Sequence, residues 1–151
     1  MEVQVYAPFH LSQLVLPSMI ERKTGHIINI SSGAGIHPKP PYRGGRGGTV
    51  YGMCKAALER FTSGLASEVQ GDGVAVNVVS PGLVATPGVG VHGLINGQTK
   101  DRVQPIKYIA EAVYQLAIVD PMKRTGTVNY AEPLLQELGI EPSELVGTQA
   151  E

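Results

Sequence analysis

Three long segments carry apolar residues at the spacing of a helix that buries one face. They lie at residues 3–22, 49–70 and 105–119, and we predict a helix over each of them. Pro105 suits the first turn of the third helix, where its missing N–H is tolerated. The apolar stripe of the second helix is predicted to consist of Ala57, Phe61, Leu65 and Val69.

Three short segments between these helices are nearly continuous in apolar, mostly β-branched residues. They cover 26–30, 74–79 and 127–130, and such runs are typical of buried parallel strands. Residues 83–104 show neither pattern and are expected to be irregular. Alternating helices and strands with short connections predict an α/β fold of three layers, with helices on both faces of a parallel sheet. We expect one domain over 1–151, a short helical turn at 133–138 and a flexible tail at 139–151.

Charge and composition narrow the class of protein. Lys and Arg total 12 and Asp and Glu total 13, so the chain lacks the basic excess of a dedicated nucleic-acid or anionic-membrane binder. No run approaches the ~18 apolar residues of a transmembrane helix, and the first residues lack the pattern of a signal peptide. Cys54 is the only cysteine, which excludes a disulfide within the chain and fits a cytoplasmic protein. The four histidines lack metal-ligand spacing, so no metal site is expected.

One pair of residues could carry acid–base chemistry. Tyr51 and Lys55 are four residues apart near the start of the second helix and therefore share a face. A phenol with a pKa of about 10 is a poor base near neutrality, but a neighbouring ammonium lowers that value. By itself the spacing is weak evidence, because any helix can present these two residues. Ser32 and the Pro81-Gly82 turn follow two predicted parallel strands, and ligands of open α/β sheets bind at that edge.

Four sequence blocks resemble the short-chain dehydrogenase/reductase family, in the family's order and over residues 3 to about 88. They are Ala7-Pro8-Phe9 with Leu16-Pro17-Ser18-Met19, Gly25 to Ser32, Tyr51-Gly52-Met53-Cys54-Lys55-Ala56-Ala57, and Val76 to Pro87. The resemblance implies the carboxyl half of a Rossmann-type domain. It also implies NAD or NADP as cofactor and hydride transfer between the nicotinamide and a small alcohol or carbonyl substrate.

The same resemblance implies roles for individual residues. Tyr51 would exchange a proton with the substrate oxygen, Lys55 would lower the pKa of Tyr51 and bind the nicotinamide ribose, and Ser32, rather than its neighbour Ser31, would polarise that oxygen. The residues expected to surround the nicotinamide, besides Tyr51 and Lys55, are Pro81, Gly82, Val84 and Thr86. The family also pairs two long helices across a subunit interface, which implies a homodimer or homotetramer through 3–22 and 49–70.

The sequence departs from the family pattern in what it lacks. No Gly-rich turn follows a strand as the dinucleotide fingerprint requires, so about half of the expected cofactor site is missing and the choice between NAD and NADP cannot be inferred. Strand 26–30 is then expected to expose an apolar edge. We therefore expect a fragment of a longer enzyme that is inactive alone. The alternatives are a chain completed by a partner, a nonfunctional remnant, and a non-catalytic oligomerisation or interaction module.

Two smaller departures concern the site itself. Gln4 occupies the position where many family members have an Asn that connects the lysine to water, so the proton relay is in doubt. The Pro38–Gly48 loop lengthens the distance along the chain between Ser32 and Tyr51. Its Arg43 and Arg46 could meet an anionic substrate group, although a solvated loop is the simpler interpretation. Two Arg-Gly-Gly units in a near-neutral chain are too few to indicate RNA binding.

Overall fold

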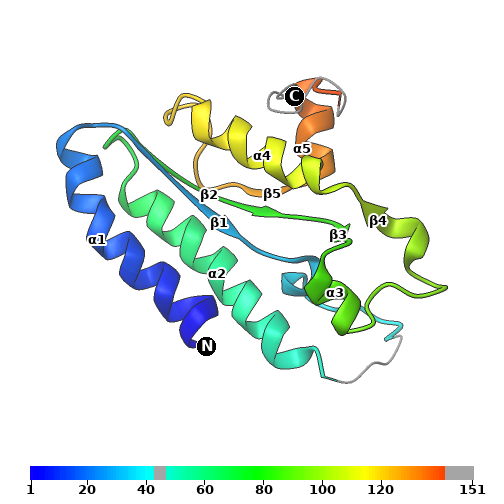
Figure 1. Ribbon diagram of the computed structural model, residues 1–151. Coiled ribbons are helices and arrows are strands. Elements are labelled where there is room, and N and C mark those ends of the chain that lie inside the picture. The colour runs from blue at the N-terminus through cyan, green and yellow to red at the C-terminus, as the bar shows by residue number, and fades with distance from the viewer. Residues whose placement is uncertain (43–46, 142–151) are drawn as a thin grey trace.

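The protein has the predicted three-layer α/β architecture. The computed structural model describes residues 1–42 and 47–141. Its main sheet is parallel, with the order β1 (Gly25–Ile30), β2 (Val74–Ser80), β5 (Val128–Tyr130). Helices α1 (Ala7–Glu21) and α2 (Thr49–Glu68) lie together on one face, and α4 (Ile106–Ile118) and α5 (Ala131–Leu138) cover the other (Figure 1).

Strand β2 forms the centre of the fold, because all seven of its residues are buried. Its side chains alternate between the two faces, as the period of a strand requires. Val74 and Val76 pack with Leu65 of α2 in one core cluster. Val79 packs with Leu116 of α4 in the other.

Strand β1 is an edge of this sheet within the described residues. It pairs in register with β2 alone, from Gly25 opposite Val74 to Ile30 opposite Val79. Ile30 remains 43% exposed, whereas the residues of β2 are buried. The apolar edge expected from the sequence is therefore confirmed.

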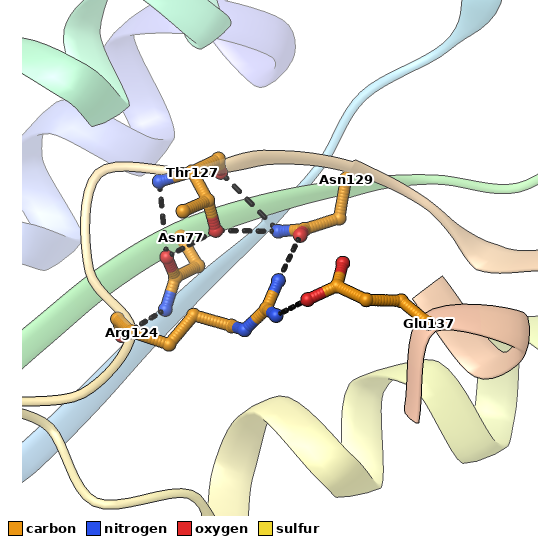
Figure 2. A network of polar contacts seen from close by, with 5 residues as sticks. All are labelled: Asn77, Arg124, Thr127, Asn129 and Glu137. Carbon is orange, nitrogen blue, oxygen red and sulfur yellow. Dashed lines mark hydrogen bonds and ion pairs between the residues drawn. The ribbon is translucent and has the colours of Figure 1, made fainter. Parts of the chain in front are cut away.

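A polar network ties β5 to the middle of the sheet (Figure 2). Asn77 of β2 accepts hydrogen bonds from the backbone N–H of Thr127 at 3.1 Å and from its hydroxyl at 2.8 Å, and donates to the carbonyl of Arg124 at 3.0 Å. Arg124 also donates to Asn129 and pairs with Glu137 of α5. Asn77 is buried, so these bonds satisfy a polar side chain that would otherwise destabilise the core.

The structure corrects several predictions about local structure. Residues Glu2–Tyr6 form π-helical turns (η1), so the regular α-helix begins at Ala7. The segment 83–104 is only partly irregular, because β3 (Leu83–Val84) pairs in parallel with β4 (Val103–Gln104). Between these strands lie helix α3 (Pro87–Val91) and a 3-10 turn, η3 (Lys100–Arg102). Strand pairing between residues 20 apart has no local sequence signature, which is why the prediction failed.

The predicted boundaries and faces of two helices also need correction. Pro105 occupies the N-cap of α4 and not its first turn. On α2, Leu65 is buried as predicted, but Ala57 and Phe61 are only partly buried. The remaining buried residues of α2 are Cys54, Lys55, Leu58, Thr62 and Ala66. Burial of a lysine and a threonine on this face could not be read from hydrophobic spacing.

Within the described ranges, no helix is both long and apolar enough to cross a membrane.

Candidate active site

The ends of β1 and β2 lie side by side at one edge of the sheet. The N–H of Ser31 donates to the carbonyl of Val79 at 2.9 Å, which continues the pairing one residue past β1. Ser32 is the second residue after β1, and Pro81 and Gly82 follow directly on β2. The two strand ends that the sequence placed at one edge are therefore adjacent.

Ser32 lies in a tight turn, which we call the serine turn and define as residues 31–35. The hydroxyl of Ser32 accepts a hydrogen bond from the N–H of Ala34 at 3.2 Å and thereby caps the 3-10 turn η2 (Gly33–Gly35). The carbonyl of Ser32 accepts from the N–H of Gly35 at 2.9 Å. These bonds define the backbone on both sides of the Ser32 side chain.

The serine turn packs against one stripe of α2. A Cβ atom added to Gly52 would lie 2.7 Å from the carbonyl oxygen of Ala34. A Cβ atom added to Gly35 would lie 2.9 Å from Oε1 of Glu59 and 3.3 Å from the backbone nitrogen of Ala56. Positions 52, 56 and 59 follow one another at helical spacing, so a single face of α2 supports the turn.

Tyr51 and Lys55 lie on the neighbouring stripe of α2. Lys55 is only 7% exposed, and its Nζ donates to the carbonyl of Ile30 at 2.8 Å. The same Nζ lies 5.6 Å from the centre of the Tyr51 ring. Tyr51 is 45% exposed, so its phenol is accessible from solvent. The lysine therefore bridges the end of β1, two residues before Ser32, and the face of the tyrosine.

Burial changes the acid–base properties of Lys55. The pKa of Lys55 is lowered from its usual value, because burial disfavours the charged ammonium, while the adjacent Cys54 acts weakly in the opposite sense. Only one acceptor, the Ile30 carbonyl, meets the Lys55 ammonium in the described part of the chain. An ammonium has three N–H donors, so Lys55 retains the capacity to bind a further ligand.

A polar cluster beside the serine turn, part of it buried, was not anticipated from the sequence. Ser31 is buried, and its hydroxyl donates to Oε1 of Glu59 at 2.6 Å. Tyr130 of β5 has a raised pKa, first because it is partly buried and second because Glu59 is negatively charged. Ser80 pairs in register with Tyr130, and its fully buried hydroxyl has no hydrogen-bond partner among the described residues. The strand pattern predicted that the ends of β1 and β2 lie at this edge of the sheet, but it did not predict that the Glu59 carboxylate of α2 lies beside them.

The residues predicted to surround a nicotinamide follow β2 but are engaged elsewhere. Thr86 caps α3, its hydroxyl accepting from the N–H of Val89 at 3.3 Å, and Val84 lies in β3. Gly82 lies directly against the side chain of Gln104, where any Cβ atom would collide. Among the described residues, no hydrogen bond joins these positions to the Tyr51–Lys55 pair. These residues and the Tyr51–Lys55 pair therefore lie at the same edge of the sheet without a hydrogen bond between them among the described residues.

A hollow of about 430 Å³ adjoins the serine turn. It is lined by residues 34–38 and by the first turns of α2, including Gly52 and Met53, but not by Tyr51 or Lys55. Gln4 is partly buried in η1, and η1 contacts α2. Arg43 and Arg46 lie outside the described residues, and no cluster suited to a metal ion occurs within the described ones.

Comparison with known proteins identifies the family. A family model for short chain dehydrogenases matches residues 1–93 of the chain. The chain belongs to the short chain dehydrogenase family. A curated relative, the 3-oxoacyl-[acyl-carrier-protein] reductase FabG of Haemophilus influenzae, is 36% identical over 133 residues, which are 84% of this chain and 52% of the relative.

Solved structures agree with this assignment. A short chain dehydrogenase/reductase family protein is 34% identical with a TM-score of 0.71, the match covering 84% of this chain and 52% of that one. Acetoin dehydrogenase from Enterobacter cloacae is 29% identical with a TM-score of 0.67, covering 85% and 50%. A Beutenbergia cavernae protein, provisionally named an NAD(P) dependent gluconate 5-dehydrogenase and solved with NADP at low occupancy, is 25% identical with a TM-score of 0.72, covering 85% and 53%. The chain thus spans about half the length of the relatives that it matches.

Proposed function

We propose that this chain carries the proton-transfer half of an NAD(P)-dependent oxidoreductase acting on a small alcohol or carbonyl compound. The observation that carries the proposal is the placement of Lys55, buried between the Ile30 carbonyl and the face of Tyr51. The family assignment and the NADP bound to a structural relative support it.

The chain's residues fit the nicotinamide end of such a cofactor. Lys55 has unused N–H donors for ribose hydroxyls, and the Pro81-Gly82 turn follows the adjacent strand at the same edge. Val84 and Thr86 are proposed to complete this region. When bound, the cofactor would supply or accept the hydride. Because the sequence contains no dinucleotide fingerprint, we propose that a complete cofactor site needs residues that this sequence does not supply.

The proposed mechanism assigns one task to each residue. Tyr51 moves a proton to or from the substrate oxygen, and its exposed phenol allows that approach. The positive charge of Lys55 stabilises the negative charge that develops on the Tyr51 oxygen during proton transfer. Ser32 donates a hydrogen bond to the substrate oxygen, while its own lone pairs accept from Ala34. Ser31 is unsuited to this task because Glu59 already engages its hydroxyl.

We infer that the chain is part of a single Rossmann-type domain, acts in the cytoplasm and does not bind nucleic acid. Residues 142–151 of the predicted tail lie outside the described residues. Leu11 and Leu14 of α1 are strongly exposed, which supports the proposed homodimer or homotetramer through α1 and α2. The same surface would serve the alternative, a non-catalytic oligomerisation module.

Titration of the purified chain with NADH and with NADPH, followed by nicotinamide fluorescence, tests the cofactor proposal. Because part of the cofactor site is missing, we expect weak but saturable binding that Lys55→Met weakens further. Turnover of a carbonyl substrate panel, where detected, should be abolished by Tyr51→Phe with the fold intact by circular dichroism. Absence of binding by a cooperatively folded chain would refute the proposed function for this chain and would leave a fragment of a longer enzyme or the non-catalytic module. Unchanged turnover in Tyr51→Phe would refute the catalytic assignment.

A further inference from the structure

Glu59 contacts both ends of the serine turn. At one end the Oε1 of Glu59 accepts a hydrogen bond from the Ser31 hydroxyl, with 2.6 Å between the two oxygens. At the other end Gly35 approaches so closely that an added Cβ would lie 2.9 Å from the same oxygen. Ser32 lies between these two contacts.

The bond between Glu59 and Ser31 has the features of a strong constraint. Ser31 is buried, and a carboxylate acceptor makes a shorter and stronger hydrogen bond than a neutral one. The backbone N–H of Ser31 is also engaged, by the Val79 carbonyl. Ser31 is therefore attached to β2 through its backbone and to α2 through its side chain.

These attachments determine where the next residue points. Ser32 leaves the sheet with extended backbone angles and folds its hydroxyl over the N–H of Ala34. That 3.2 Å bond is long, and Ser32 and Ala34 are both at least partly accessible to solvent. The cap alone is therefore a weak constraint, and the buried contacts of Ser31 and Gly35 with α2 must supply the rest.

We propose that Glu59 is a positioning residue, which through Ser31 and Gly35 holds the serine turn so that the Ser32 hydroxyl faces the substrate. The proposal rests on the role assigned to Ser32 above. In this role Glu59 acts through the serine turn and not by contact with substrate or cofactor, and one helical turn separates it from Lys55 on α2. The helix that carries the proton-transfer pair thus also sets the place of the hydroxyl.

The test compares three variants of the full chain. Glu59→Leu removes the acceptor, Ser31→Ala removes the donor, and Glu59→Gln retains a carbonyl oxygen that can accept from Ser31. Glu68→Leu, an exposed position on the same helix, is the matched control. The first readout is the set of ¹⁵N backbone order parameters of residues 32–35, with those of β2 as the internal reference.

We expect order parameters near 0.85 in the wild type and in the control, and below about 0.6 for the serine turn in Glu59→Leu and Ser31→Ala. Glu59→Gln should restore most of the order. A purely structural role would instead lower the order of β2 and the serine turn together. If Glu59→Leu does not fold, Ser31→Ala decides, since it deletes one oxygen only. Wild-type order of residues 32–35 in Ser31→Ala would overturn the proposal.

A second readout connects the serine turn to chemistry. Where Tyr51-dependent turnover is detected, Glu59→Leu should lower kcat at least about tenfold with KM for the nicotinamide cofactor unchanged, and Glu59→Gln should recover most of kcat. An unchanged kcat in Glu59→Leu would refute the link to Ser32. If turnover persists in Tyr51→Phe, the function proposed above fails, while the order parameters still test the positioning by Glu59.

Discussion

Replacement of Gly52 by Ala should destabilise the protein, although the same replacement usually stabilises a helix. Inside a helix Ala is favoured over Gly by about 0.8–1 kcal/mol. At Gly52, however, the new Cβ would lie 2.7 Å from the carbonyl oxygen of Ala34. That oxygen belongs to the backbone of the serine turn, so it can yield only if the turn moves away from α2.

The two effects have opposite signs and can be compared. Forcing an extra methyl into a packed contact costs about 1–3 kcal/mol. Subtracting the helix preference leaves Gly52→Ala destabilised by about 0–2 kcal/mol. The same helix offers a control at Gly64, where the added Cβ would meet only the end of the Arg60 side chain, at 2.7 Å. Arg60 is exposed and flexible, so Gly64→Ala should gain about 0.5–1 kcal/mol.

Urea unfolding of both variants, followed by far-UV circular dichroism, measures this difference. We expect the free energy of unfolding of Gly52→Ala to be about 0.5–3 kcal/mol below that of Gly64→Ala, with equal m values. Coincident transitions monitored by tyrosine fluorescence would establish that two-state analysis applies. If Gly52→Ala proves as stable as Gly64→Ala, the serine turn is not packed closely against α2. The proposal that Glu59 holds this turn through close packing at Gly35 would then be contradicted as well.

Three further predictions concern buried polar groups. Because the pKa of Lys55 is lowered in the folded protein, the unfolded state binds more protons at alkaline pH. The wild type should therefore gain stability relative to Lys55→Met as pH rises from 7 toward the usual lysine pKa of about 10.4. Urea unfolding of both proteins at several pH values measures this, and a stability difference that does not change with pH would contradict it. Asn77→Leu leaves the Thr127 N–H and the Arg124 carbonyl without their hydrogen-bond partner. It should lower the free energy of unfolding, measured by urea titration, by about 2–5 kcal/mol. A loss under about 1 kcal/mol would show that the network in Figure 2 adds little stability. Ser80→Ala removes a buried hydroxyl that lacks a partner among the described residues, so thermal unfolding should show unchanged or higher stability, and a clear loss would reveal an unseen partner.

Much of the fold follows from patterns that act over short distances. The strands at 26–30 and 74–79 and the helix at 49–70 were predicted within two residues of their observed ends. Strand and helix periods are properties of the local backbone, so they appear directly in the order of apolar and polar residues. The i, i+4 relation of Tyr51 and Lys55 belongs to the same class, because one helix determines it.

Other features were decided only when distant segments met. The pairing of Leu83 with Val103, the burial of Lys55 against the Ile30 carbonyl, and the contact of Glu59 with Ser31 each join segments at least 20 residues apart. No hydrophobic period records such contacts, because they depend on how helices and loops pack on the sheet. The apolar edge of β1 and the Tyr51–Lys55 pair could thus be determined from sequence alone. The contacts that position Ser32 were decided by tertiary packing, because Gly52 and Glu59 contact the serine turn only once that turn packs against their face of α2.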